Sequence, residues 1–204
     1  MAVTCPVDLD TIRLREAIRS TYSRVATAPE GEFHFHRGAA YAEAHLGYDP
    51  LELSRLPPSA VESFAGVGNP LRIEGIPAGA TVVDVGCGAG MDLLLAARVV
   101  GPRGRAIGID MTDGMLRKAE AGASAAGLAH VELRQGDALE LPVESASADF
   151  VLSNGVLNLA PDKRRAFAEV LRVLRPGGRF LYADIAVASE LPESVRRDID
   201  LWSG

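Results

Sequence analysis

Residues 81–90 read TVVDVGCGAG, and this stretch decides the fold. Its first half, Thr81–Val85, is short and rich in β-branched residues, as is typical of a strand buried on both faces of a parallel sheet. Three alternate glycines follow, and Met91–Ala97 then begin a helix. Glycine leaves the backbone open to close approach, and the amides at a helix N-terminus point outward. The stretch therefore predicts a backbone cradle for a nucleotide-like ligand, with a tight turn that binds nothing as the alternative.

After this stretch, predicted strands alternate with predicted helices. Four further strands are expected, at Arg105–Asp110, His130–Gln135, Asp149–Asn154 and Arg179–Ile185. The helices are expected over 112–126, from Asp162 to a stop at 175–178, and from a start at Leu191–Ser194. Alternation at these intervals is typical of a sheet covered on both faces. We therefore predict an α/β, Rossmann-like, doubly wound fold with a mainly parallel sheet and helices on both faces.

The N-terminal third, residues 1–70, is predicted to be a helical extension that forms a lid over the ligand site of residues 71–204. It begins with an amphipathic helix over 9–25 and ends in the glycine-rich loop Ala65–Pro70, which either links two elements or closes over the strand tips. Between them, Phe33–His36 alternate two aromatic rings with two imidazoles, so an extended backbone would put both histidines on one side. No third ligand lies nearby in the sequence, so we expect no metal site.

The composition excludes several classes of function. The chain has 204 residues and a formal net charge of -6, so no basic surface is available for a nucleic acid. It has no apolar run of about 18 residues, and its N-terminus lacks the features of a signal peptide. We expect a cytoplasmic protein with neither a nucleic acid nor a membrane as partner, and the sequence leaves its oligomeric state open.

The two cysteines, Cys5 and Cys87, are far apart in the sequence. Neither a disulfide framework nor a Cys-x-x-Cys metal or redox motif is therefore available, and we expect two free thiols.

The spacing of the glycines discriminates between two classes of nucleotide. Dinucleotide folds use G-x-G-x-x-G, whereas this chain has G-x-G-x-G and places Met91 at the third position after Gly88. A bulky side chain there does not suit close approach to a pyrophosphate. Asp110 ends the second strand, where a carboxylate can accept both hydroxyl protons of a ribose. Asp84, inside the first strand, could turn toward an amino group of the ligand or brace the loop.

Five motifs, in this order along the chain, resemble those of class I S-adenosylmethionine-dependent methyltransferases: VDVGCGAG, GID, GDA, DFVLSN and LRPGG. The resemblance implies S-adenosylmethionine as cofactor. It also implies a role for nine residues. The methionine end of the cofactor lies at Asp84, Gly86, Gly88 and Gly90, and its ribose at Asp110. Its adenine lies at Met111, Asp137 and Ala138, and the transferred methyl group lies beside Asn154. A nicotinamide-dependent oxidoreductase is the alternative that Met91 and the pair Asp137–Ala138 fit poorly.

A narrower resemblance runs from about Phe33 to Gly204. The segments FHFHRG, AHLGYDP, SFAGVGNP, SNGVLNLAPDKRRAF and RRDIDLWSG are similar to arsenite methyltransferases and their close small-molecule relatives. The resemblance implies a small-molecule methyl acceptor. Where that family carries cysteines, this chain has Val67 and Gly155, and a third family thiol normally follows a segment like DLWSG. An S-adenosylmethionine-binding protein without turnover is therefore the main alternative function.

The sequence assigns no catalytic residue, because methyl transfer needs little acid–base machinery. Tyr22, Tyr41 and Asn158 are candidates for the acceptor pocket. A complete fold of the resembling class has seven strands, so we expect the C-terminal strands to be missing from this chain. A truncated sequence, a completing partner chain, or a stop codon decoded as selenocysteine would each account for that expectation.

Overall fold

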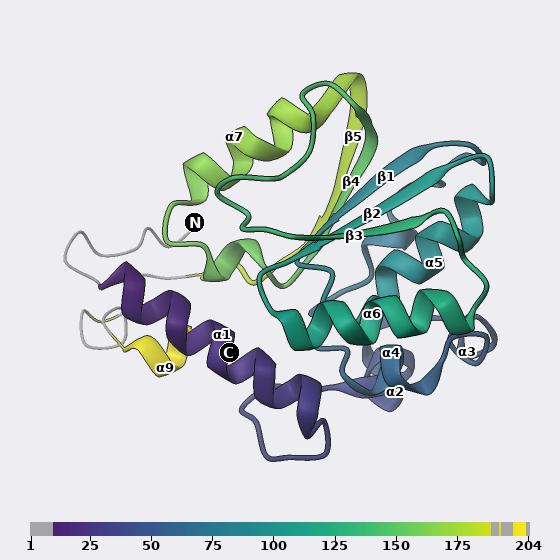
Figure 1. Ribbon diagram of the computed structural model, residues 1–204. Helices are drawn as coiled ribbons and strands as arrows, with labels where there is room; N and C mark the ends of the chain where they lie inside the picture. The colour runs from purple at the N-terminus through teal and green to yellow at the C-terminus, as the bar shows by residue number, and fades with distance from the viewer. Residues whose placement is uncertain (1–9, 189–191, 193–197, 203–204) are drawn as a thin grey trace.

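The computed structural model describes residues 10–188, 192 and 198–202, and its centre is a five-stranded sheet (Figure 1). The strand order is β3-β2-β1-β4-β5, and every neighbouring pair is parallel. The strands are β1 (Thr81–Val85), β2 (Arg105–Asp110), β3 (Val131–Gln135), β4 (Ala148–Asn154) and β5 (Leu174–Ala183). The predicted α/β doubly wound architecture with a parallel sheet is confirmed.

The chain leaves the middle of the sheet in two directions, and this reversal sets the helix layers. From β1 it runs outward through α5 (Met91–Val100) and α6 (Asp113–Ala125), and from β4 it runs to the other edge through α7 (Lys163–Val173). Because parallel crossovers are right-handed, α5 and α6 cover one face of the sheet and α7 covers the other (Figure 1). The reversal lies between β1 and β4, and open sheets of this kind bind ligands beyond the carboxyl ends of the strands at that point.

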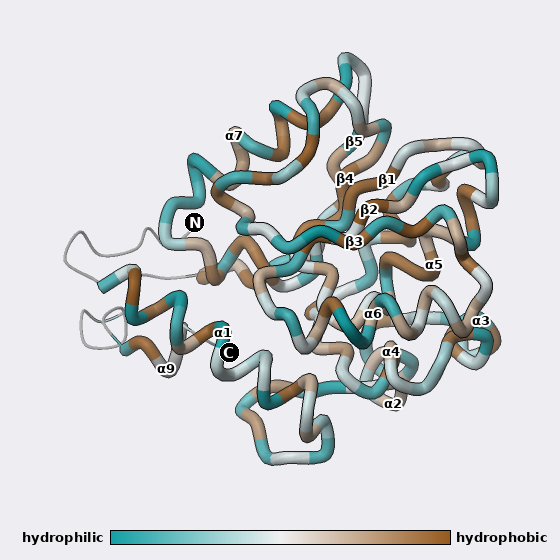
Figure 2. Tube along the Cα trace, in the orientation of Figure 1, coloured by the Kyte–Doolittle hydropathy of each residue, from teal (hydrophilic) through white to brown (hydrophobic). Residues whose placement is uncertain are grey.

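Both faces of the central strands are buried. Val82 and Leu152 pack toward Val100 of α5, whereas Val83 and Val151 belong to the cluster that packs on α7. Successive side chains of a strand point to opposite faces, so a strand covered on both sides reads as a continuous apolar run. Figure 2 shows this hydrophobic character along β1 and β4.

The N-terminal segment packs on the outer side of α5 and α6. It contains α1 (Thr11–Thr27), α2 (Gly38–Tyr41), the π-helix η1 (Ala42–Leu46), α3 (Pro50–Leu53), α4 (Pro58–Glu62) and the 3-10 helix η2 (Pro70–Arg72). Tyr48, Val61 and Phe64 share one buried cluster with Leu94 and Met91 of α5. The extension and the sheet therefore share part of one hydrophobic core.

Most predicted boundaries agree with the structure within two residues, and β1 and β2 agree to the residue. The largest difference is at β5, which begins at Leu174 and not at Arg179, because Leu174 pairs with Ala148 before an irregularity in the register. Helix α7 consequently ends at Val173, before the predicted stop.

The remaining expectations concern short segments. Phe33 and Phe35 are half-buried and His34 and His36 are exposed, although the backbone bends at His34 and Phe35 and is not the extended segment that the predicted alternation assumed. The expected helix start at Leu191–Ser194 lies outside the described residues except for Pro192, and Cys5 also lies outside them. A short helix, α9, is described at Ile199–Trp202.

Within the described part of the chain, no helix combines the length and apolar character needed to cross a membrane.

Leu94 tests whether the extension and the sheet unfold together. Its side chain is 0% exposed between α5 and the N-terminal helices, whereas Leu171 on α7 is 71% exposed. Leu94→Ala is expected to lower the free energy of unfolding by about 2–5 kcal/mol in a single transition, because it leaves a cavity. Leu171→Ala is the control and is expected to change stability by less than about 0.5 kcal/mol in urea unfolding. Two separate transitions in the wild-type protein would contradict a shared core.

Candidate functional site

One pocket opens at the carboxyl ends of the strands, where the direction of the chain reverses. All of the predicted cofactor residues except Gly90 line it: Asp84, Gly86, Gly88, Asp110, Met111, Asp137, Ala138 and Asn154. They come from the tips of β1, β2, β3 and β4 and the turns that follow them. The pocket thus brings together residues spread over seventy positions of sequence, from Asp84 to Asn154.

The glycine turn after β1 forms a wall of bare backbone. Gly86 and Gly88 have φ angles of 72° and 53°, in the left-handed region that favours glycine. A Cβ at Gly86 would clash with the side chain of Val156, whereas a Cβ at Gly88 would meet nothing within 4 Å. Gly90 has a packing role, since a Cβ there would lie 3.1 Å from that of Ala119 on α6. Gly88 therefore exposes backbone to the pocket, while Gly90 allows α5 and α6 to pack closely.

Cys87 belongs to this turn as a packing residue. Its side chain is 7% exposed and lies against β2, where a Cβ at Gly108 would come within 2.8 Å of the sulfur. Burial raises the pKa of the thiol, and the nearby charges of Asp110 and Asp84 raise it further. A neutral thiol is a poor nucleophile and a poor ligand for soft metals.

Asp110 fixes the turn from the tip of β2. Its Oδ2 accepts a hydrogen bond from the Gly88 amide at 2.9 Å, and its Oδ1 accepts one from the Thr112 amide at 2.8 Å. Burial raises the pKa of this carboxyl group, and the backbone amides oppose the shift. Each carboxylate oxygen has more than one acceptor site, so both can still receive a hydroxyl group of a ligand.

Two further carboxyl groups lie at the β1 end of the pocket. Asp84 is 2% exposed, and its Oδ2 has no hydrogen-bond partner. Asp92, in the first turn of α5, is 5% exposed and also lines the pocket. Burial raises the pKa of Asp84 well above its usual range, and the charge of Asp92 adds to the shift. The sequence interpretation missed Asp92, although an acid inside the apolar run Met91–Ala97 is a signal that could have identified it.

Asn154 joins several parts of the site through one amide. Its Oδ1 accepts hydrogen bonds from the amides of Val67 at 2.8 Å and Gly68 at 3.2 Å, and its Nδ2 donates to Asp92 Oδ2 at 2.9 Å. Tyr48 completes the network by donating its hydroxyl proton to Asp92 Oδ1 at 2.7 Å. The loop at 65–68 is therefore held against the tip of β4.

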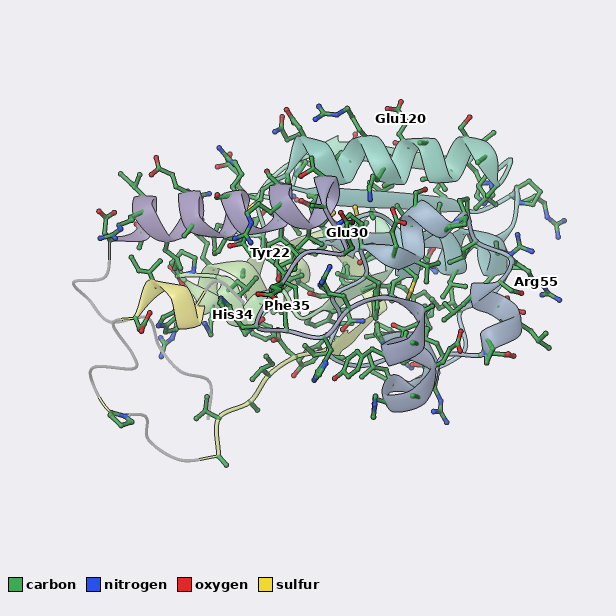
Figure 3. All side chains as sticks on the ribbon, turned by 90° about the horizontal axis from the view of Figure 1, so that it is seen from below. Tyr22, Glu30, His34, Phe35, Arg55 and Glu120 are labelled. Carbon is green, nitrogen blue, oxygen red and sulfur yellow. The ribbon has the colours of Figure 1, made fainter. Side chains whose placement is uncertain are left out.

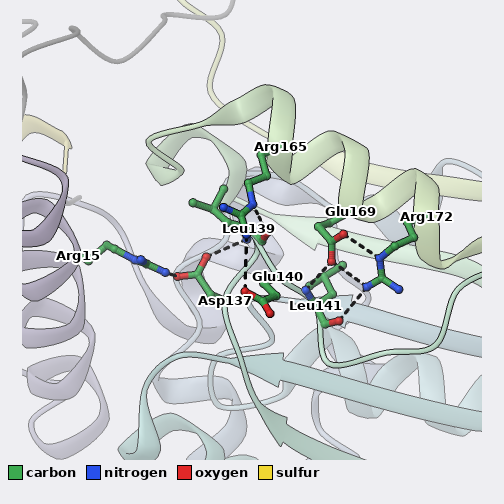
Figure 4. Close-up of polar contacts among 8 residues, drawn as sticks. All are labelled: Arg15, Asp137, Leu139, Glu140, Leu141, Arg165, Glu169 and Arg172. Carbon is green, nitrogen blue, oxygen red and sulfur yellow. Dashed lines mark hydrogen bonds and ion pairs between the residues drawn. The ribbon is translucent and has the colours of Figure 1, made fainter.

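Helix α1 also borders the pocket, through Arg15, Ile18 and Tyr22. Arg15 forms an ion pair with Asp137 Oδ2 at the tip of β3 (Figure 4), and Asp137 Oδ1 accepts a hydrogen bond from the Leu139 amide at 2.8 Å. The sequence interpretation did not anticipate this role of Arg15. The contact brings the N-terminal extension directly to a predicted adenine-binding residue.

Tyr22 is placed by aromatic packing. Its ring stacks on Phe35 with centroids 5.9 Å apart, and Figure 3 shows the two side chains together beside α1. Burial raises the pKa of Tyr22 to about 12, with smaller contributions from the charges of Asp110 and Asp184. Of the three acceptor-pocket candidates, Tyr22 lines the pocket, whereas Tyr41 and Asn158 are not among its lining residues. Within the described residues, no group of three or more His, Cys, Asp or Glu side chains is placed to hold a metal ion.

Asp92 is expected to make the stability of the ligand-free protein depend on pH. Burial raises its pKa from 3.8 to about 6, so the folded state favours the protonated carboxyl group. This contribution, of about 3 kcal/mol, is fully present below about pH 4 and is lost as the pH rises through 6. Urea unfolding between pH 4 and 7 should show a flatter profile for Asp92→Asn, while Glu120→Gln, on the outer side of α6 (Figure 3), should keep the wild-type profile. Parallel profiles for wild type and Asp92→Asn would contradict the assignment.

Comparison with known proteins agrees with this geometry. A methyltransferase domain model matches residues 76–203. The arsenite methyltransferase of Halobacterium salinarum is 36% identical over an alignment of 214 positions, which covers 98% of this chain and 54% of that protein. The demethylmenaquinone methyltransferase of Bacillus cytotoxicus is 35% identical over 111 residues, which cover 54% of this chain and 47% of that protein. The chain thus spans about half the length of these relatives.

A solved structure shares the fold and the sequence similarity. An arsenic(III) S-adenosylmethionine methyltransferase from Chlamydomonas reinhardtii superimposes with a TM-score of 0.61 at 36% identity, over 76% of this chain and 52% of that one. The chain therefore belongs to the methyltransferase domain family.

Proposed function

We propose that this chain binds S-adenosylmethionine in the pocket between the strand tips and α1, and that it transfers the methyl group to a small molecule. The observation that carries the proposal is the meeting of one bare glycine turn with three carboxyl groups at successive strand tips, Asp84, Asp110 and Asp137. The scaffold is close to that of the arsenite methyltransferases.

The residues present fit this cofactor at each of its parts. The buried Oδ2 of Asp84, which lacks a partner, suits an ammonium group. The carboxylate of Asp110 suits the hydroxyl groups of a ribose, and Met111 offers an apolar surface to an adenine ring. Arg15 lines the pocket but is already paired with Asp137, which agrees with a ligand that carries no phosphate.

When bound, the cofactor supplies a methyl group on a positively charged sulfur. The chain contributes by orientation and by exclusion of water, since Ile18 and Tyr22 of α1 line the pocket. The acceptor is proposed to lie against Gly66, Gly155 and Val156, where the loop at 65–68 meets the tip of β4. Alignment of an acceptor atom with the methyl group accounts for most of the rate enhancement expected in such a reaction.

The acceptor side differs from the pattern of the resembling enzymes at two positions that are neighbours in space. A Cβ at Gly155 would lie 3.3 Å from Cγ1 of Val67. These are two positions at which the resemblance to arsenite methyltransferases implies cysteines. Trivalent arsenic prefers thiolate ligands. The described free cysteine, Cys87, is a buried thiol in the cofactor turn. We therefore propose an acceptor that is not held by thiolates at this place.

Methyl transfer is tested with labelled S-adenosylmethionine and a panel of acceptors that includes arsenite and a hydroquinone. Transfer to a panel member, together with weaker cofactor binding by Asp110→Asn, is the expected result. The loss of a charged acceptor from a buried hydrogen bond predicts a decrease in affinity of about tenfold or more. Cofactor binding without transfer to any acceptor would favour the alternative of a binding protein without turnover.

Restoring thiols at the acceptor side tests where the acceptor lies. The double variant Val67→Cys/Gly155→Cys is expected to bind arsenite more tightly than the wild-type protein in a direct titration, because two adjacent thiolates suit the metalloid. Gly155 has a φ of 69°, so any side chain there costs about 1–3 kcal/mol of stability. The matched control Val67→Ala/Gly155→Ala carries the same strain without sulfur. Equal arsenite affinity in the two double variants would argue against this location.

A further inference from the structure

We propose that Asp92, held in place by Tyr48 and Asn154, acts with Asp84 to supply the negative charge that pairs with the cationic methionine end of S-adenosylmethionine. The inference rests on the proposed function only in taking that cofactor as the ligand of the pocket. It makes Asp92 a cofactor-binding residue that none of the predicted motifs contains.

The two carboxyl groups are buried close to each other. They come from consecutive elements, Asp84 from β1 and Asp92 from the first turn of α5, and both line the pocket. The charge of Asp92 raises the pKa of Asp84, because little water is present to screen the two groups. Asp84 also leaves Oδ2 without a hydrogen bond, and the whole residue is 2% exposed.

No cation of the described chain neutralises this pair. The ion pairs among residues 10–188 connect arginines and lysines to other carboxylates: Glu52, Glu62, Glu74, Glu132, Asp137, Glu140, Asp149 and Glu169. Buried carboxylates without a cation are costly, and each such group needs a partner. S-adenosylmethionine brings two positive centres, the ammonium group and the sulfonium. A cationic ligand therefore supplies what the pocket wall lacks.

The network around Asp92 fixes the direction of its charge. The Tyr48 hydroxyl donates to Oδ1 and the Asn154 amide donates to Oδ2, so each oxygen keeps an acceptor site for a ligand. Tyr48 is 4% exposed and packs edge-on against Phe64 with centroids 5.4 Å apart. The Asn154 amide is tied in turn to the loop at 65–68. Three separate segments thus hold one carboxylate in a single orientation.

A purely structural role explains this arrangement less well. The hydrogen bonds from Tyr48 and Asn154 do not offset the burial of this charge, which works against the folded state near neutral pH. A carboxylate that weakens the free protein at neutral pH can be retained because it strengthens binding of a cation. The geometry therefore points to a charge kept for the ligand.

The test compares two ligands that differ in charge. S-adenosylmethionine and 5′-methylthioadenosine share the adenosine and the sulfur, but the second lacks both the ammonium and the sulfonium charge. Calorimetric titrations at pH 7 are expected to show at least tenfold weaker binding of S-adenosylmethionine to Asp92→Asn, with 5′-methylthioadenosine within twofold of wild type. The control Glu120→Gln removes an exposed carboxylate and should leave both affinities within twofold. Equal weakening of both ligands, or no change in either, overturns the proposal.

A second measurement needs no variant and covers the case in which Asp92→Asn does not fold. Between pH 5 and 7 the ammonium group of the cofactor stays protonated, because α-amino groups titrate near pH 8. The titratable groups that face Asp92 are Tyr48 and Asp84, and Asp110 acts on Asp84. Wild-type affinity for S-adenosylmethionine should fall at least fivefold from pH 7 to 5, while that for 5′-methylthioadenosine stays within twofold. A flat profile for the charged ligand overturns the proposal.

A third variant separates positioning from charge. Tyr48→Phe removes one hydrogen bond to Asp92 but keeps the carboxylate, so its loss of S-adenosylmethionine affinity should be smaller than that of Asp92→Asn. A loss as large or larger overturns the assignment of the charge to Asp92. These titrations contain no methyl acceptor, so failure of methyl transfer would leave their outcome unaffected.

Discussion

The amides of Gly86 and Cys87 both donate to the carbonyl oxygen of Ile109, at 2.7 and 2.9 Å, and the site depends on this contact. It turns the chain sharply at the end of β1 and ties the turn to the neighbouring strand. The turn must then be built from residues that tolerate positive φ, which glycine does without strain. Because these residues are glycines, they also place no side chain on the pocket wall. The residues that allow the turn to form therefore also leave the pocket open to a ligand.

The N-terminal extension completes the site. Its short helices pack on α5 through the cluster around Leu94 and Phe64, and this contact fixes the position of Tyr48. Helix α1 approaches from another side and places Arg15 on Asp137 (Figure 4). Two separate contacts thus position the part of residues 1–70 that borders the pocket. The predicted division into an extension and a cofactor domain describes the order of the chain, while the packing joins the two parts.

The sequence predicted the sheet well because its signals are local. The β-branched run Thr81–Val85 ends at a glycine and the second strand ends at Asp110, so both boundaries were clear. The first residues of β5 were not predicted, because the segment contains Pro176 and two glycines, which favour a break. Pairing of Leu174 with Ala148 nevertheless extends the strand. In the site, the glycines and strand-tip acids followed a recognisable spacing. Asp92 and Arg15 did not, since their partners Tyr48 and Asp137 are 44 and 122 residues away in the sequence.

The amide of Asn154 contacts the loop that borders the proposed acceptor side and the carboxylate that borders the cofactor side. A displacement of that loop changes the hydrogen bonds available to Asp92, and a change at Asp92 is transmitted back to the loop. The two proposed subsites are therefore connected through one planar group. Thermodynamic linkage makes such coupling reciprocal: whatever binding of the acceptor does to the affinity for the cofactor, binding of the cofactor does equally to the affinity for the acceptor.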